Sequence, residues 1–394
     1  MASNGICDRV AIVGMGCTAF GERWDKSAGD LLIDAANDAY QSAGVDPDQV
    51  DAYWLGTTGG TSGLTLSLPL KIQYKPVTRV ENMCATGSEA LRNACYAVAS
   101  GAYDLVCAIG VEKLKDSGFS GLTGGGPPSD GTESGLTAPA NFSLLAPAYA
   151  KKYGVGEDTL KDVISQIAYK NHFNGAQNER AQYQKIVPIE KIKNSPKIAG
   201  MLGIFDCSGV SDGSAAAIVC RTEDAHKYSD HPIYVKALSF VAGPAEGSMR
   251  QDYDFTTFPE VVASAEDAYR QAGIENAREQ ISMAEVHDCF TPTELVLMED
   301  LGFSERGQAW QDTLDGRFDL DGAQPINPDG GLKSFGHPIG ASGLRMMYEM
   351  WLQLRGEAGS RQIKDPKLGL THNLGGAPGR CVSFVSIVGD QLAA

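Results

Sequence analysis

The stretches CATGSEALR at residues 84–92 and HPIGASGLR at residues 337–345 share one pattern, X-x-x-G-x-x-x-L-R. Each stretch opens a run of apolar residues with helical spacing, so each predicts the start of a helix. The match places Cys84 and His337 at equivalent positions, just before a helix. It indicates that the chain contains two copies of one structural unit.

A second match supports this duplication. The segment DAYQSAGV at residues 38–45 aligns with DAYRQAGI at residues 267–274, in the same order along the chain. Each segment ends an amphipathic helix pattern with a glycine, where a left-handed C-cap is needed. Two matches in the same order indicate two similar α/β halves.

The pattern around these matches alternates short apolar strands with helices. Such alternation is typical of an α/β fold, and we expect a buried, mostly parallel sheet in each half. The predicted strands cover residues 9–15, 51–56, 104–111, 214–220, 232–240, 283–288, 367–373 and 381–388. The predicted helices cover residues 27–43, 86–100, 259–272, 292–301 and 341–354.

The same pattern predicts the domain organisation. We expect an N-terminal half at residues 1–225 and a C-terminal half at residues 226–394. Residues 113–205 interrupt the first copy and include a Gly/Ser/Pro-rich stretch at 117–135. We predict that this insertion is a loop domain that contributes to substrate specificity.

The composition excludes several classes of protein. Of 394 residues, 43% are hydrophobic, and the net charge is −16, so we expect a large core and no basic face for nucleic acid or an anionic membrane. None of the nine cysteines forms a C-x-x-C pair, and no segment predicts a signal peptide or a membrane span. We therefore expect a cytoplasmic protein with reduced thiols.

Cys84 and His337 are the first candidates for chemistry. A cysteine just before a helix lies at the positive end of the helix dipole, which is expected to lower the pKa of its thiol. His337, held between Gly336 and Pro338, can take the proton of a thiol that faces it. The alternatives are a small buried cysteine and a histidine of a surface turn.

Residues His287, Asp288 and Cys289 end a predicted strand, where α/β sheets place their ligands. Alternation along a strand puts His287 and Cys289 on one face and Asp288 on the other. A metal site is the competing interpretation, but this arrangement leaves too few ligands for a closed zinc site.

Glycines at positions 375, 376 and 379 precede the last predicted strand. Glycines at such a place let backbone N–H groups approach a reacting group. An ordinary turn between two strands is the alternative.

Together these segments resemble the thiolase superfamily, and within it the sterol-carrier-protein-type and archaeal acetoacetyl-CoA thiolases. Four motifs carry the resemblance over essentially the whole chain: VENMCATGSEAL with Cys84, HDCF at 287–290, GHPIGASG at 336–343 and HNLGG at 372–376. It implies a five-layered α-β-α-β-α thiolase fold built from two similar halves, with the loop domain inserted in the first.

The resemblance also implies roles for single residues. Cys84 is the expected acyl-accepting nucleophile, and His337 is the group that activates it. Cys289 is the expected acid/base, because it replaces a second cysteine that ordinary thiolases carry at the position of Asn373. His287 is expected to help His337 bind the thioester oxygen.

Two further groups of contacts follow from the resemblance. The backbone N–H groups of Cys84 and Gly375 are expected to form a second oxyanion hole. Ser342, Asn373 and Gly376 are expected to contact the substrate or CoA.

The implied reaction is cleavage of a 3-oxoacyl-CoA by CoA, or the reverse condensation, with CoA as co-substrate, no permanent cofactor and no metal. A bulky or aromatic substrate such as benzoylsuccinyl-CoA is one expectation, and short-chain acetoacetyl-CoA is the alternative. The competing classes are a steroid side-chain aldolase-like subunit of the same fold, a catalytically silent subunit, and an acyltransferase for non-CoA carriers. The presence of Cys84, His337 and Cys289 together argues against the first two.

The resemblance also implies partners. We expect a homodimer or a dimer of dimers, and relatives of this kind often work with a small subunit that carries a zinc ribbon and an OB-fold. Because the chain is acidic, the phosphates of CoA are expected to bind Lys and Arg of residues 151–197, or a partner.

Overall fold

The computed structural model describes residues 5–116, 137–248 and 250–393. The strands of the main sheet are β1 (Val10–Cys17), β2 (Ala52–Gly56), β3 (Val77–Val80), β4 (Leu105–Glu112), β7 (Gly213–Arg221), β8 (Ile233–Ala242), β9 (Met283–Glu285), β10 (Leu368–Ala377) and β11 (Arg380–Gly389), and a separate hairpin is formed by β5 (Lys197–Ala199) and β6 (Leu202–Gly203). The helices are α1 (Ala28–Ala43), α2 (Leu64–Leu70), α3 (Thr86–Ala99), α4 (Ala138–Phe142), α5 (Leu145–Tyr153), α6 (Glu157–Gly175), α7 (Ile189–Lys193), α8 (Pro259–Ala272), α9 (Ala277–Gln280), α10 (Thr291–Asp300), α11 (Ala309–Leu314), α12 (Gly331–Ser334) and α13 (Ser342–Leu354).

Strand pairing shows that the expectation of a mostly parallel sheet is wrong. The strand order is β3-β2-β4-β7-β1-β8-β11-β10-β9, and the parallel pairs in it are β2–β3, β2–β4 and β9–β10. The other neighbours are antiparallel. For β10 and β11 the reason is local, because the two residues Pro378 and Gly379 connect them, and so short a connection permits only antiparallel pairing.

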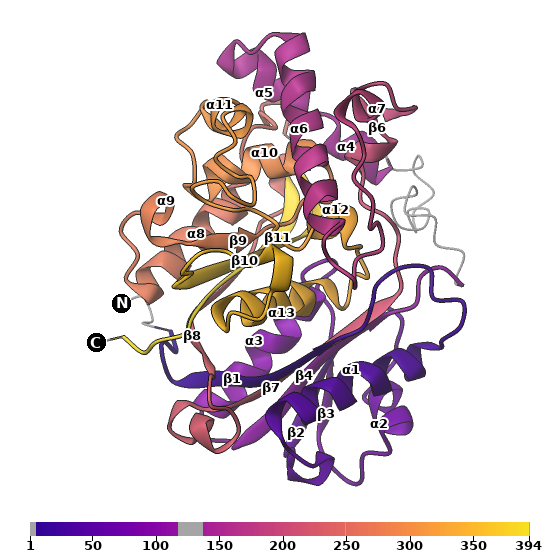
Figure 1. Cartoon of the computed structure of the whole chain (residues 1–394), viewed down its shortest axis with the longest axis vertical. Coiled ribbons are helices and arrows are strands. Elements are labelled where there is room, and N and C mark those ends of the chain that lie inside the picture. The colour runs from indigo at the N-terminus through magenta and orange to yellow at the C-terminus, as the bar shows by residue number, and fades with distance from the viewer. Residues whose placement is uncertain (1–4, 117–136, 249, 394) are drawn as a thin grey trace.

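Two helices, α3 and α13, lie side by side between the two halves of the sheet (Figure 1). The halves meet where β1 and β8 pair through a short register, Ala11 with Tyr234 and Ile12 with Ile233. Helix α1 packs on the outer face of the first half, and α8 packs on that of the second (Figure 1). The predicted five-layered α-β-α-β-α architecture is confirmed, and the repeated segments occupy matching layers.

Glycines let the starts of α3 and α13 approach each other closely. A Cβ atom on Gly110 would lie 2.0 Å from the carbonyl oxygen of Gly340, and one on Gly87 would lie 2.8 Å from the same atom. No side chain can be accommodated at such distances, so these positions require glycine. The glycine shared by the two repeats thus allows the helix starts that carry Cys84 and His337 to converge.

The described part of the insertion, residues 137–205, contains α4 to α7 and the β5–β6 hairpin. Helix α6 packs against α10, α11 and α12, which belong to the second half of the chain (Figure 1). The stretch 117–135 lies outside the described residues. The division of the chain at residues 225 and 226 and the role of the insertion stay predictions.

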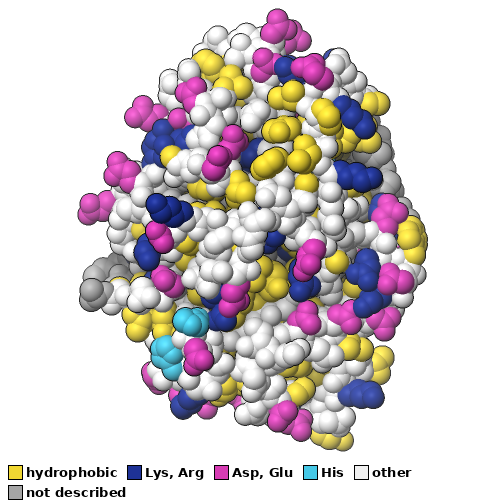
Figure 2. Space-filling model, viewed as in Figure 1, with side chains coloured by type: hydrophobic (Ala, Val, Ile, Leu, Met, Phe, Trp, Pro, Cys, Tyr) yellow, Lys and Arg dark blue, Asp and Glu magenta, His cyan; other side chains and the backbone are white. Residues whose placement is uncertain are grey.

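In the described part of the chain, no helix is long and apolar enough to cross a bilayer. Acidic and basic side chains alternate over the face shown in Figure 2, and hydrophobic side chains gather in its upper part.

Candidate active site

Cys84 lies on a tight turn directly before α3. Met83 in this turn has a left-handed φ of 50°, a conformation that costs a non-glycine residue about 1–3 kcal/mol. Thr86 holds the turn, because its Oγ1 accepts the N–H of Asn82 at 2.9 Å and donates to the carbonyl of Met83 at 2.5 Å. The strained turn is therefore fixed by local hydrogen bonds and keeps Cys84 half-buried.

The environment of Cys84 differs from the one expected from its place before a helix. Burial raises the pKa of the Cys84 thiol to about 12, and the carboxyl groups of Glu112 and Glu81 act in the same direction. These effects outweigh the helix dipole, whose influence is of the order of 1 kcal/mol. In the resting protein Cys84 is therefore a neutral thiol, and the expected lowering of its pKa is wrong.

His337 is oriented by two serines. Its backbone N–H donates to Ser211 Oγ at 3.0 Å, and its Nδ1 lies 2.8 Å from Ser342 Oγ. With the Ser342 hydroxyl donating its one proton to the carbonyl of Pro338 at 3.0 Å, we assign Nδ1 of His337 as the donor to Ser342. The lone pair is then on Nε2, which has no hydrogen-bond partner among the described residues.

Burial and the nearby Arg345 guanidinium lower the pKa of His337 to about 3. The imidazole is therefore neutral near pH 7, which is the form that can accept a proton.

His287 completes a group of three around one point. One ligand-type atom each of Cys84, His287 and His337 lies within 4.8 Å of the other two. The rings of His287 and His337 meet edge to face, with centroids 5.3 Å apart. Burial, together with the neighbouring His337 and His372, lowers the pKa of His287 well below its usual value, so this imidazole is also neutral.

The same three atoms are of the types that bind zinc. The predicted acyl transfer needs the same three side chains. The expectation that the protein holds no metal stays a prediction.

The predicted strand at 283–288 is too long, because β9 ends at Glu285 and His287, Asp288 and Cys289 lie in the segment that follows it. In this segment Asp288 faces away from the group of three. Its carboxylate accepts the N–H of Leu332 at 2.7 Å and the side-chain amide of Asn171 at 2.8 Å. It therefore anchors the segment that leads to His337 and is not among the residues that line the cavity.

Cys289 lies on the cavity side of the same segment and is 5% exposed. Its Sγ is 3.7 Å from Thr293 Oγ1, and burial raises the pKa of this thiol well above its usual value. Cys84 is close enough to raise the pKa of Cys289 further. Cys289 is thus a neutral thiol, able to donate a proton.

Two glycines of β10 border the turn that carries Cys84. A Cβ atom on Gly375 would lie 2.6 Å from the carbonyl oxygen of Asn82 and 3.2 Å from Cβ of Met83. Gly376 has a left-handed φ of 114° and lines the cavity. Glycine at both positions lets the β10 backbone approach Cys84 closely.

Ser342 and Asn373 are fully buried and are not among the cavity-lining residues. Ser342 contacts His337, and Asn373 accepts a hydrogen bond from Ser88 of α3 at 2.5 Å. In this structure Ser342 would therefore affect a substrate only by way of His337, and Asn373 only by way of Ser88.

A cavity of about 490 Å³ contains the site. Its walls include Cys84, His287, Cys289, His337 and Gly376, together with apolar side chains such as Phe142, Ile198, Ile204, Phe205, Phe290 and Ile339. Several polar side chains of the wall are not predicted by the motifs of the sequence, among them His172, Lys333 and Lys115. The position of Lys333, four residues before His337, could have indicated that it lies near the site. The sequence pattern of α6 contains no such indication for His172.

Comparison with known proteins agrees with this geometry. Residues 10–203 match the family model "Thiolase, N-terminal domain", and residues 243–387 match "Thiolase C-terminal domain-like". The chain belongs to the thiolase family. The predicted enzyme class, a CoA-dependent acyltransferase of the thiolase type, is confirmed at this level.

Individual relatives extend over almost the whole chain of this thiolase. Acetyl-CoA acetyltransferase of Methanothermobacter thermautotrophicus is 36% identical, over 94% of this chain and 97% of the relative. Sterol carrier protein 2 of Gallus gallus is 31% identical, over 93% of this chain and 70% of the relative. Among solved structures, "Ltp2-ChsH2(DUF35) aldolase" matches 98% of this chain and 99% of that chain, with a TM-score of 0.83 and 26% identity.

Proposed function

We propose that this thiolase cleaves a 3-oxoacyl-CoA, or forms one by the reverse condensation, through an acyl group carried on Cys84. The convergence of Cys84, His287 and His337 in one cavity is the observation that carries the proposal. The unpartnered Nε2 of a neutral His337 supports its role as acceptor of the Cys84 proton.

The cleavage then has two steps. As His337 takes the proton of Cys84, the sulfur attacks the 3-oxo carbon, and the bond between C2 and C3 breaks. The departing enolate of acetyl-CoA receives a proton from Cys289. In the second step, the CoA thiol gives its proton back to Cys289, its sulfur takes the acyl group, and Cys84 recovers its proton from His337.

Two sets of donors would stabilise the negative oxygens formed in these steps. His337, holding on Nε2 the proton taken from Cys84, and His287, protonated on the nitrogen facing the substrate, would bind the thioester oxygen of the enolate. The backbone N–H groups of Cys84 and Gly375 would bind the oxygen of the tetrahedral intermediate on Cys84. Such donors are typically worth about 10²- to 10³-fold in rate.

The names of the relatives are compatible with a short acyl chain and give an aromatic substrate no support. A relative at 36% identity is an acetyl-CoA acetyltransferase, whereas benzoylsuccinyl-CoA has no support from the comparisons. The solved relative "Ltp2-ChsH2(DUF35) aldolase" keeps an aldolase as the second candidate. An acyl-enzyme distinguishes the two, because the thiolase route requires it.

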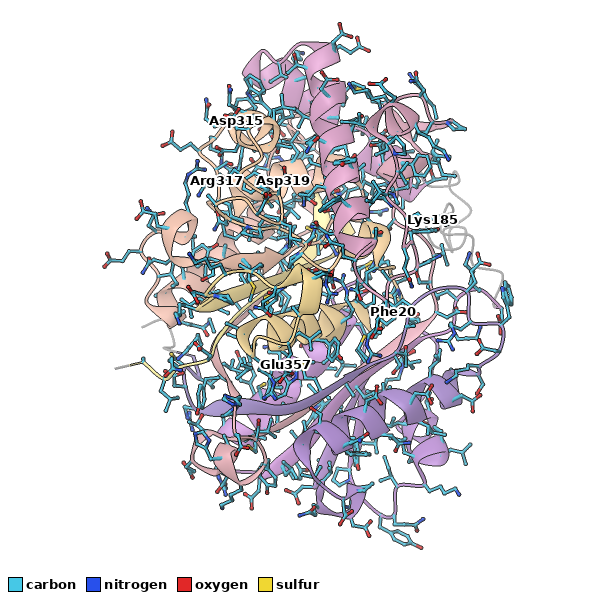
Figure 3. The ribbon with its side chains drawn as sticks, in the orientation of Figure 1. Phe20, Lys185, Asp315, Arg317, Asp319 and Glu357 are labelled. Carbon is cyan, nitrogen blue, oxygen red and sulfur yellow. The ribbon has the colours of Figure 1, made fainter. Side chains whose placement is uncertain are left out.

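A second cavity of about 480 Å³ supports a place for CoA. It shares His172, Tyr183 and Phe205 with the first cavity, and Lys185 and Lys191 line it. Lys185 lies at the edge of the molecule, below α7 in the view of Figure 3. We propose that these two lysines bind the phosphates of CoA, in the region where the sequence predicts basic contacts.

Intact-mass analysis after incubation with a 3-oxoacyl-CoA tests the proposal. The wild-type protein should gain the mass of one acyl group, and Cys84→Ala should gain none and should lose thiolysis. Cys95→Ala is the matched control, because Cys95 is a fully buried thiol of α3 outside the cavity. An adduct that persists in Cys84→Ala, or an active protein without any adduct, contradicts the proposal.

The edge of the sheet supports a homodimer as the assembly. Strand β3 is an edge strand, and Leu64, Leu68 and Tyr74 beside it are 73%, 81% and fully exposed. Open edges and exposed apolar side chains of this kind are normally covered. Light scattering should report a dimer for the wild type and a monomer for Leu68→Glu; a wild-type monomer contradicts this assignment.

A small second subunit is supported by the solved relative, whose name gives ChsH2(DUF35) beside Ltp2. We propose a subunit of that kind for this chain. Mass measurement of the protein purified from its source should then give a heteromer rather than the homodimer alone.

A further inference from the structure

Lys333 is a buried lysine that the proposed reaction does not use. It is 2% exposed and lines the same cavity as Cys84, His287, Cys289 and His337. Its Nζ donates to the carbonyl of Cys207 at 3.1 Å and lies 3.5 Å from Nε2 of His172. Of its three N–H donors, at least one therefore has no partner in the described part of the chain.

The carboxylates nearest to Lys333 are engaged elsewhere. Asp206 pairs with Lys161 at 3.3 Å and accepts the hydroxyl of Thr291 at 2.9 Å. Asp288 accepts backbone and amide N–H groups, as described above. Within the ranges that the structure describes, no carboxylate lies within ion-pair distance of Lys333 Nζ. The amino group of Lys333 thus lacks the direct ion pair that a fully buried lysine normally has, and burial lowers its pKa, although Asp206 and Asp288 act in the opposite direction.

His172 adds a second donor to the same part of the cavity wall. Its ring is 3% exposed, and its Nε2 faces the Lys333 ammonium, so Nε2 is the acceptor and Nδ1 carries the proton. This Nδ1 has no hydrogen-bond partner among the described residues. Burial lowers the pKa of His172 to about 3, so it acts as a neutral donor.

The rest of the wall explains why these two groups would select a ligand. Apolar side chains form most of it, and a few placed polar groups in an apolar cavity fix the orientation of a ligand. A buried cation without a paired carboxylate favours an anionic ligand, because pairing offsets the cost of burying its charge. A carboxylate on the acyl chain would lie in the same cavity as Lys333, whereas Lys185 and Lys191 line the neighbouring cavity proposed for the phosphates of CoA.

We propose that Lys333, with His172 beside it, binds a carboxylate on the acyl chain, so that the preferred substrate is the CoA thioester of a 3-oxo dicarboxylic acid. This inference rests on the proposed thiolase reaction and adds to it the charge of the acyl group. Lys333 is in this view a specificity-determining residue, and the chemistry on Cys84 is unchanged.

A matched pair of substrates tests the inference. 3-Oxoadipyl-CoA and 3-oxohexanoyl-CoA have acyl chains of the same length, and they differ in a terminal carboxylate against a methyl group. The wild type should cleave the first with the higher kcat/KM. Lys333→Met should lower kcat/KM for 3-oxoadipyl-CoA by about 10- to 150-fold, the range for a buried hydrogen bond to a charged group, and change that for 3-oxohexanoyl-CoA by less than about 3-fold.

Two further variants control the result. Lys333→Arg keeps the charge and should keep the preference for the dicarboxylic substrate. Lys236→Met removes another buried lysine, which pairs with Asp8 outside the cavity, and should leave the ratio of the two substrates unchanged. Melting temperatures of all variants show whether each one is folded.

Three outcomes overturn the inference. One is a wild-type enzyme without preference for the dicarboxylic substrate, a result that contradicts the inference even if Lys333→Met does not fold. Another is an equal loss for both substrates in Lys333→Met, which assigns Lys333 to CoA or to the segment around Cys207. The third is an unchanged ratio in Lys333→Met. Failure of the proposed function looks different, because the wild type would then form no acyl-enzyme with either substrate.

Discussion

The hydrogen bond between His337 and Ser342 makes the sharpest prediction about the site. Ser342→Ala removes the acceptor of the His337 Nδ1 proton and leaves that N–H buried without a partner. An unsatisfied buried donor costs about 1–3 kcal/mol, which corresponds to about 5- to 150-fold in a rate that depends on it. The imidazole can escape this cost by moving the proton to Nε2, and then it no longer accepts the proton of Cys84.

We therefore expect acylation of Cys84 in Ser342→Ala to slow by about 5- to 150-fold. Stopped reactions followed by intact mass measure this rate directly. Ser264→Ala is the matched control, because Ser264 is also a buried helix serine that donates to a backbone carbonyl and contacts a second side chain, Ser383, away from the cavity. If Ser342→Ala slows acylation no more than Ser264→Ala does, Ser342 only contributes stability and the assigned tautomer of His337 is wrong.

Three other predictions follow from the buried groups. Cys289→Ala should keep acylation of Cys84 and lose about 10²- to 10⁴-fold in thiolysis and in hydrogen exchange at C2 of an acyl-CoA; preserved exchange would move the acid/base role to a histidine. In the free enzyme, the rate of alkylation of Cys84 by iodoacetamide should be low at pH 7 and should rise without a plateau up to pH 9, because burial raises the pKa of this thiol to about 12. A plateau of this rate below pH 8 would show a preformed thiolate. His372→Gln should lose less stability than the wild type when the pH falls from 7.5 to 5. The reason is that burial lowers the pKa of His372 to about 3, so only the unfolded chain takes up its proton as the pH falls below about 6.5. The expected difference in the free energy of unfolding at pH 5 is about 2 kcal/mol, and an equal pH dependence of the two melting temperatures would contradict it.

The layers of the fold could be predicted because the repeated segments mark equivalent elements in the two halves of the chain. A shared glycine at positions 87 and 340 indicates equivalent helix starts, and the structure shows that these glycines are where the two helices meet. Strand β3 and helix α2 could not be predicted in the same way. The four residues of β3 pair with one neighbour only, and α2 reads LTLSLPL, a strand-like alternation with a proline inside. Their conformation is set by packing, not by local pattern.

The residues of the candidate site also fall into those that the sequence could predict and those that it could not. Residues at the starts of helices and at glycine turns, such as Cys84, His337 and Gly375, could be predicted because their backbone surroundings leave a mark in the sequence. His172 could not, because its place in the cavity depends on how the inserted α6 packs on the second half of the chain. The protonation states could not be predicted either, since burial by distant segments determines them.

These protonation states restrict how the reaction can start. Burial raises the pKa of Cys84 and lowers that of His337, so both groups are neutral at rest and proton transfer between them is unfavourable in the free site. A preformed thiolate–imidazolium pair is therefore not the resting state. In the proposed reaction, the proton would therefore leave Cys84 as its sulfur bonds to the substrate, when the negative charge passes to an oxygen and the donors around that oxygen stabilise it. The helix start that follows Cys84 would thus act on the transition state of the proposed acylation, not on the free thiol.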